Sequence, residues 1–256
     1  MLKGKKGIIF GIANDHSIAW GIAKKFKEQG ASLAIVYQNE TLLKRVAPLA
    51  KELNAELMIK CDFSINNELE TCFQEISKKW ESIDFVVHAV AFSNKNELNG
   101  KYINTSKENF INTLHISCFS LTKIALLSST LMANGGSIIT LSFYGANKVM
   151  PSYNVMGIAK AALEISVKYL SVDLGDKKIR VNAISSGPMR TLSGAVIGKS
   201  REVYKYTQEN SPLKRNVKLE EIGKTALFLA SDMSSGITGE IHFVDCGFNI
   251  VGMPNN

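Results

Sequence analysis

The sequence contains few of the residues that build metal centres, disulfide frameworks or membrane spans. Its 256 residues include four cysteines and four histidines, scattered without a C-x-x-C pair or an H-E-x-x-H motif. This spacing excludes the usual zinc sites and a disulfide framework, so we expect no metal and a reduced, cytoplasmic environment. Five prolines and the lack of any run of about 18 apolar residues predict a globular chain with no membrane segment.

Positive charge is in excess, with a net charge of +7 and a pI near 9.1. The basic residues lie along the whole chain, so the charge does not favour nucleic acid over an acidic protein or an anionic cofactor. The opening MLKGKKGIIFGIA mimics a secretory leader, but Asn14-Asp15-His16 interrupts its apolar run and no small-residue cleavage pattern follows. We therefore expect no leader.

Short apolar runs alternate with amphipathic stretches of helical period. The expected strands are residues 7–12, 32–37, 56–61, 83–90, 137–142, 179–184 and 240–244, and the expected helices are residues 17–29, 40–53, 66–80, 106–133, 153–174 and 219–231. Continuously apolar strands are typical of a parallel sheet covered on both faces. The alternation predicts one doubly wound, Rossmann-type α/β sheet of about seven strands. With no linker or repeat, residues 1–256 are expected to form a single domain.

One connection is much longer than the others. More than thirty residues separate the strand that ends near Ile184 from the helix that begins near Leu219. Such long connections in a compact domain are usually functional. This one leaves the sheet at the carboxyl edge, where open α/β sheets bind ligands. We expect residues 188–214, called the lid below, to cover a substrate.

A polar turn joins the first strand to the first helix. Gly11 lets the chain turn without a Cβ in the way of a ligand, and Ser17 has the position and side chain of an N-cap. Exposed N–H groups and the helix dipole at such a turn attract a pyrophosphate. The spacing G-x5-S-x3-G, from Gly11 to Gly21, is a weaker signal than G-x-G-x-x-G. A capped loop with incidental glycines is the alternative.

The next two strands end in candidates for the adenosine side of a dinucleotide. Gln38 stands where an acid typically binds the ribose of NAD, and its amide can also bond a ribose hydroxyl. Lys44 and Arg45 come later, so no basic residue stands there to hold a 2′-phosphate. This pattern favours NADH over NADPH. Asp62 can accept from the adenine amine, although a simple turn Asp is an equal alternative.

Tyr153 and Lys160 are seven residues apart in YNVMGIAK, two turns along one helix face. A phenol has an ordinary pKa near 10, and a neighbouring ammonium that also bonds a ribose is expected to lower it. The hydroxyl can then stabilise an oxyanion as a hydride arrives. The pair is common by chance, but its place after the fifth strand of a dinucleotide-binding sheet favours a catalytic role.

The segments GIANDHSIAWGIA, YQNE, CDF, LSFYGANKVMPSYNVMGIAKAALE, RVNAISSGPMRTL and GEIHFVDCGF span nearly the whole chain. Together they resemble the NADH-dependent enoyl-[acyl-carrier-protein] reductases of bacterial fatty-acid synthesis, which are short-chain dehydrogenases/reductases. The resemblance implies hydride transfer from NADH to the β-carbon of a trans-2-enoyl thioester, followed by protonation of the enolate at the α-carbon. It also implies an acyl carrier protein as partner and a homotetramer. Lys199, Arg201 and Lys205 in the lid can steer that acidic carrier, or simply form a solvated face.

The resemblance assigns roles to residues at the matching positions. Tyr153 would bond the thioester carbonyl and Lys160 the nicotinamide ribose. The further contacts implied are Ser17 and Ile18 at the pyrophosphate, Gln38 on the adenosine side, Asp62 and Phe63 at the adenine, and Ala89 and Phe92 along the cofactor and the substrate mouth.

The lid and the catalytic helix add further candidates. In GPMRTL, Met189 can present its backbone to the nicotinamide carboxamide and Thr191 can bond the pyrophosphate, unless this is a plain strand exit. Ala195 and Val196 give the lid an apolar side suited to an acyl chain, or else pack on the core. Met156 is either a further acyl contact or a core residue.

Phe143 occupies a slot that carries Tyr or Phe in the family, and it leaves only one hydroxyl at the enolate. Ketone-reducing relatives place a serine slightly further upstream of the tyrosine than Ser142, which is eleven residues before Tyr153. This spacing speaks against a ketoacyl or hydroxysteroid-type reductase. The other alternative is a regulator that binds a dinucleotide without chemistry, for which an intact Tyr153/Lys160 pair is unnecessary.

Overall fold

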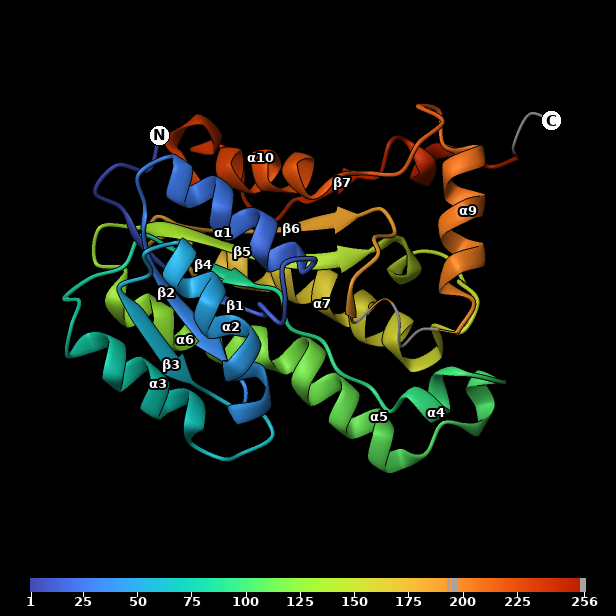
Figure 1. Ribbon diagram of the computed structural model, residues 1–256, viewed down its shortest axis with the longest axis horizontal. Coiled ribbons are helices and arrows are strands. Elements are labelled where there is room, and N and C mark those ends of the chain that lie inside the picture. The colour runs from blue at the N-terminus through green and yellow to red at the C-terminus, as the bar shows by residue number, and fades with distance from the viewer. Residues whose placement is uncertain (193, 195–197, 254–256) are drawn as a thin grey trace.

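A computed structural model describes residues 1–192, 194 and 198–253 (Figure 1). All seven strands within these residues are parallel and form one sheet, in the order β3-β2-β1-β4-β5-β6-β7. This is the doubly wound order predicted from the alternation of strands and helices. The strands are β1 (Lys6–Phe10), β2 (Ser32–Tyr37), β3 (Leu57–Lys60), β4 (Phe85–His88), β5 (Gly136–Phe143), β6 (Ile179–Ser186) and β7 (Ile241–Val244).

Helices cover both faces of this sheet. They are α1 (Ile18–Glu28), α2 (Glu40–Glu52), α3 (Glu68–Ser77), α4 (Lys95–Leu98), α5 (Lys107–Leu114), α6 (Ser120–Leu131), α7 (Asn154–Asp173), α9 (Ser200–Asn210) and α10 (Leu219–Ala230). Apolar residues of α1, α2 and α10 form one core with the sheet, and those of α3, α6 and α7 form the other. Side chains along β1 alternate between the two cores, with Ile8 and Phe10 in one and Ile9 in the other. This explains why the strands are apolar throughout.

The expected helix at 106–133 is divided in two by a π-helix, His115–Phe119. The hydroxyl of Ser117 in this segment accepts from the backbone N–H of Phe92 (2.9 Å) and donates to the carbonyl of Phe92 (3.0 Å). The side chain thus ties the loop after β4 to the helix. Periodicity alone does not reveal such an insertion, which is frequent near functional sites.

The α5–α6 region is also the most apolar helical stretch in the chain. Lys107–Leu131 is long and apolar enough to cross a membrane by length and composition alone, and 44% of its most apolar window is buried inside the fold. Part of its apolar surface therefore lies on the outside of the chain, at Ile111, Phe119 and Leu126.

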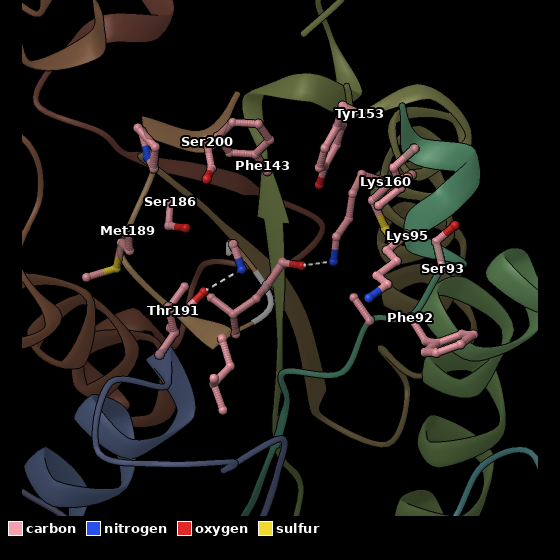
Figure 2. Close-up of a pocket in the computed structure, with 18 of the residues that line it drawn as sticks. Phe92, Ser93, Lys95, Phe143, Tyr153, Lys160, Ser186, Met189, Thr191 and Ser200 are labelled. Atoms are coloured by element: carbon pink, nitrogen blue, oxygen red, sulfur yellow. Dashed lines mark hydrogen bonds between the residues drawn. The ribbon is translucent and has the colours of Figure 1, made fainter. Parts of the chain in front are cut away.

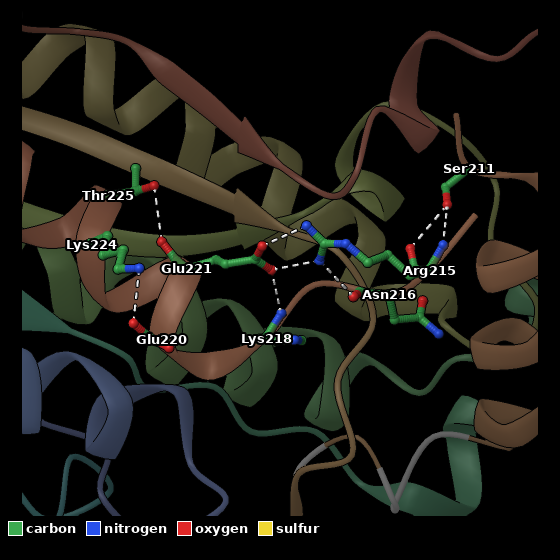
Figure 3. A network of polar contacts seen from close by, with 8 residues as sticks. All are labelled: Ser211, Arg215, Asn216, Lys218, Glu220, Glu221, Lys224 and Thr225. Atoms are coloured by element: carbon green, nitrogen blue, oxygen red, sulfur yellow. Dashed lines mark hydrogen bonds and ion pairs between the residues drawn. The ribbon is translucent and has the colours of Figure 1, made fainter. Parts of the chain in front are cut away.

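The long connection after β6 contains α9 and returns to α10 through a polar anchor (Figure 3). Arg215 donates two hydrogen bonds to Glu221, from Nη1 to Oε2 (2.8 Å) and from Nη2 to Oε1 (2.6 Å). Glu221 also accepts from the backbone N–H of Lys218, which caps α10. The amide of Asn216 donates to the carbonyl of Tyr204 on α9 (2.9 Å). These bonds hold the end of the lid against the first turn of α10.

Candidate active site

A cavity of about 1540 Å³ opens at the carboxyl ends of β1, β4, β5 and β6. It is lined by the turn after β1, the loop after β4, the start of α7 and both ends of the lid. Ligand pockets for one small molecule typically measure about 300–1,000 Å³, so the cavity has room for a dinucleotide and a second ligand. The predicted site residues in its wall are Gly11, Ser17, Ile18, Ala89, Phe92, Phe143, Tyr153, Met156, Lys160, Met189 and Thr191.

The turn after β1 passes close to the end of β4. Gly11 has φ of +101°, and a Cβ at this position would overlap the carbonyl oxygen of Ala89. Ala89 itself donates from its N–H to the carbonyl of Phe10 (3.2 Å). Only glycine combines this backbone conformation with so close an approach. Two predicted cofactor residues, 78 positions apart in the sequence, therefore form one surface of the cavity.

Ser17 stands at the N-cap of α1, but its side chain does not cap the helix. Its hydroxyl oxygen accepts from the backbone N–H groups of Ala13 (3.0 Å) and Asn14 (3.1 Å). The expectation of a capping side chain was wrong because the loop itself offers N–H groups to this oxygen. The first N–H groups of a helix have no intrahelical partner, so the start of α1 keeps donors for an anionic ligand.

Gln38, Asp62 and Phe63 lie at the ends of β2 and β3, outside the wall of this cavity. Gln38 Nε2 donates to Asp62 Oδ2 (3.0 Å), and Asp62 Oδ1 accepts from the N–H and the hydroxyl of Ser64. Burial acts to raise the pKa of Asp62, but the bonds from Ser64 and Gln38 outweigh it and hold this pKa below its ordinary value. Both oxygens of Asp62 thus have partners within the chain, including the turn contact that was the alternative.

Tyr153 and Lys160 come together at the centre of the cavity (Figure 2). They are only 5% and 6% exposed, and the tyrosine hydroxyl and lysine ammonium point toward the same space. Lys160 Nζ donates to the carbonyl of Leu141 at the end of β5 (2.6 Å). The ring of Phe143 packs edge-on against Tyr153, with centroids 5.1 Å apart. The three predicted catalytic residues therefore form one group.

The electrostatics of this pair differ from the expectation. Burial, with a further contribution from the charge of Glu164, raises the pKa of Tyr153 above its ordinary value. The predicted lowering of this pKa by Lys160 is wrong for this structure, because the loss of water around the phenol dominates. Burial lowers the pKa of Lys160 to about 8. Near pH 7 the site therefore contains a neutral phenol and an ammonium, and both can donate hydrogen bonds.

Ser142 lies in the wall of the cavity, next to Phe143. Its hydroxyl donates to Glu164 Oε1 (2.6 Å), so its proton is engaged behind the site. A ketone-reducing enzyme of this fold would need a serine hydroxyl beside the tyrosine. The contact with Glu164 therefore supports the interpretation of Ser142 reached from its spacing.

The lid lines the opposite side of the cavity. Met189 and Thr191 follow β6, and Thr191 Oγ1 accepts from the backbone N–H of Gly194 (2.9 Å). Their place in the wall fits the predicted contacts with a cofactor. Ala195 and Val196, the predicted acyl contacts, lie outside the residues that the structure describes.

Residues 11–249 match the protein-family model described as Enoyl-(Acyl carrier protein) reductase. The chain belongs to this family.

Individual relatives support this assignment. The chain is 53% identical, over 99% of its length and 95% of the relative, to "Enoyl-[acyl-carrier-protein] reductase [NADH] 2" of Rhizobium meliloti. Among solved structures it is similar to FabI from Candidatus Liberibacter asiaticus, with a TM-score of 0.97 and 54% identity over 99% of this chain and 98% of that one. It is equally similar to the reductase of Anaplasma phagocytophilum in complex with NAD, with a TM-score of 0.96 and 54% identity, covering 100% and 97% of the two chains.

Sequence reasoning predicted Ala89 and Phe92 on the loop after β4 but missed other residues on this side of the reductase's cavity. The loop after β4 and the short helix α4 contribute Ser93 and Lys95, and Figure 2 shows Lys95 extending toward Lys160. On the lid side, the guanidinium of Arg190 lies over the ring of Tyr204, 4.6 Å from its centroid. A signal was present, since the polar stretch 91–105 is a long connection at the carboxyl edge of the sheet.

Proposed function

We propose that this reductase uses NADH to reduce the 2,3 double bond of trans-2-enoyl thioesters carried by an acyl carrier protein. The observation that carries the proposal is the group formed by Tyr153, Lys160 and Phe143 in the cavity, with Ser142 turned to Glu164. When bound, NADH supplies the hydride that the β-carbon receives, and the α-carbon of the resulting enolate takes a proton.

The residues around the cavity fit a dinucleotide. Gly11 and Ala89 form a surface that a larger side chain would block, and Ser17 and Ile18 present the start of α1 to a pyrophosphate. Lys160 would hold the nicotinamide ribose through its ammonium. Met189 and Thr191 would bind from the lid side. The adenosine end would be held by Gln38, Asp62 and Phe63.

The substrate would be held by the chain's own donors and apolar side chains. Tyr153, as a neutral phenol, donates to the thioester carbonyl oxygen and stabilises the negative charge that develops there. Phe143 and Met156 form apolar wall beside this hydroxyl. Phe92, which is 47% exposed, would lie at the mouth of the cavity. Residues 188–214 would act as the lid of a single domain over 1–256, with Ala195 and Val196 facing the acyl chain.

A comparison of two thioesters tests the reaction. We expect the purified chain to oxidise NADH in the presence of a crotonyl thioester and to show little activity with an acetoacetyl thioester. Absorbance at the NADH band measures both reactions under identical conditions. The reverse preference would assign the chain to ketone reduction, and salt-dependent DNA binding without NADH oxidation would favour a regulator.

An acidic carrier protein fits the charge around the lid. Lys199 pairs weakly with Glu202 and Lys205 with Glu209 on α9, while Arg201 lines the cavity. Cations at the entrance of a site accelerate encounter with an acidic partner. We propose that this interaction takes place in the cytoplasm, and that nucleic acid and membrane are not partners.

We also propose that the chain assembles into a homotetramer through α6 and α7. Large apolar side chains are exposed on these helices and the π-helix, including Tyr169 at 71% and Val172 at 80% exposure. The others in this group are Phe119, Leu126, Ile158 and Ile165. Large exposed apolar patches mark protein–protein contacts, and these two helices pack against each other. A second copy would also cover the exposed part of the α5–α6 stretch.

Light scattering during gel filtration tests this assembly. We expect a mass of about four times the 28.1 kDa of one chain. A Tyr169→Glu exchange places a charge in the proposed contact and should shift the mass toward smaller species. A wild-type mass of one chain would contradict the proposal.

A further inference from the structure

A buried carboxylate lies behind the Tyr153–Lys160 pair. Glu164 is on α7 one helical turn after Lys160, and it is only 9% exposed. Its Oε1 accepts from the hydroxyl of Ser142 (2.6 Å) and its Oε2 from the amide of Asn147 (3.1 Å). Burying a charged group is unfavourable unless it is hydrogen-bonded. Because both oxygens have donors, the fold supports a carboxylate at this place.

Glu164 is part of a set of contacts that joins β5 to α7. Three successive residues of the strand each contact a different residue of the helix. Leu141 accepts from Lys160, Ser142 donates to Glu164, and Phe143 packs on Tyr153, which immediately precedes α7. We call this set the β5–α7 clasp. A shift of the strand end relative to the helix would disturb all three contacts, two of which involve the proposed catalytic residues.

We infer that Glu164 is a positioning residue for the reduction: it fixes β5 against α7 through Ser142, and its negative charge favours the ammonium form of Lys160. Tyr153 is a neutral phenol with or without this charge. The inference rests on the proposed roles of Tyr153 and Lys160.

The charges around the pair agree with this role. Burial lowers the pKa of Lys160 to about 8, and Cys118 of the π-helix and Glu164 both act against this decrease. The charge of Glu164 also adds to burial in raising the pKa of Tyr153. A nearby anion thus favours the ammonium and disfavours the phenolate.

The remaining neighbours do not duplicate the charge of Glu164. His88 of β4 is buried between Thr140 and Ser120, and burial, reinforced by the charge of Lys160, lowers its pKa to about 3, so it is neutral. β5 contributes no titratable side chain. Lys95 of α4 extends toward Lys160 from the other side of the cavity and is a further positive charge. Glu164 is the single carboxylate among the described groups that shift the pKa of Lys160.

A Glu164→Gln exchange keeps the size of the side chain and removes its charge. NADH affinity is expected to fall as the pH rises, and we expect the midpoint of this fall to move down by about one pH unit in the variant. The reason is that Lys160 then loses its proton more easily. Fluorescence titration with NADH alone, between pH 6 and pH 10, measures this midpoint without substrate. Turnover of a crotonyl thioester at pH 8 should fall about five-fold, in proportion to the lost ammonium. Asp173→Asn is the matched control, since it removes a carboxylate from an exposed position on the same helix, and it should leave both values unchanged.

A Ser142→Ala exchange distinguishes the effect of the β5–α7 clasp from the effect of the negative charge of Glu164. It removes the hydroxyl contact and leaves Glu164 in place, so we expect kcat to fall several-fold with the wild-type pH midpoint and a similar KM. The shift caused by Glu164→Gln should persist in a Cys118→Ser background, which removes the other group acting on Lys160.

Two results would overturn the inference. One is a folded Glu164→Gln protein with the pH midpoint and kcat of the wild type. The other is a Ser142→Ala protein with unchanged kcat. If the Glu164→Gln protein does not fold, the Ser142→Ala result alone decides the question. Failure of the proposed function looks different, because the wild type itself would then not reduce the crotonyl thioester.

Discussion

A Tyr153→Phe exchange is expected to lower kcat for the reduction of an enoyl thioester by about 100-fold or more. The loss of one preorganised donor to a developing oxyanion typically has an effect of this size. The hydroxyl points into the cavity, and the described residues provide it with no hydrogen-bond partner. Its removal should therefore leave the fold and the affinity for NADH nearly unchanged. Steady-state kinetics with a crotonyl thioester and NADH measures the effect.

The controls for this exchange are the melting temperature and an NADH titration. Both should match the wild type, because the ring of Phe at position 153 can keep the edge-on contact with Phe143. A variant with wild-type turnover would show that Tyr153 is not the donor. A variant with weak NADH binding would show that its hydroxyl acts on the cofactor instead.

A Lys160→Met exchange is expected to weaken NADH binding about 10- to 100-fold, with a comparable loss of turnover at limiting NADH. A hydrogen bond from a charged donor contributes about 1.5–3 kcal/mol, which corresponds to this range. Methionine keeps the length of the side chain and removes a charge that is costly to bury. The variant without NADH should therefore melt at or above the temperature of the wild type.

Thermal unfolding with and without NADH separates binding from folding. A ligand stabilises the folded state by RT ln(1 + [L]/Kd), so the shift caused by NADH should shrink or vanish in Lys160→Met. The wild type should also lose NADH affinity as the pH rises through about 8, the pKa of Lys160, because the ammonium gives up its proton there. The variant should lack this pH dependence. If the NADH affinity of Lys160→Met is within about three-fold of the wild-type value, Lys160 does not bind NADH.

Local sequence patterns predicted most of the fold and the residues at the centre of the site. Apolar runs and helical periods predicted all seven strands, although the predicted strands 7–12 and 83–90 end two residues earlier, at Phe10 and His88. The interval from Tyr153 to Lys160 predicted that they lie together on α7, because two helical turns bring side chains to the same face. Gly11 was recognised at its turn, but the reason that only glycine fits there is the carbonyl of Ala89, far away in the sequence.

The sequence by itself determined the order of strands and helices along the chain, the position of the Tyr153–Lys160 pair and the family, since all three depend on spacing along the chain. Only the tertiary structure decided which partners each polar group has. The hydroxyl of Ser17 turns to its own loop, Gln38 bonds Asp62, and Ser142 bonds Glu164. It also decided that the phenol of Tyr153 stays neutral. Hydrogen bonds and burial depend on residues brought together from distant parts of the chain, and no local pattern records them.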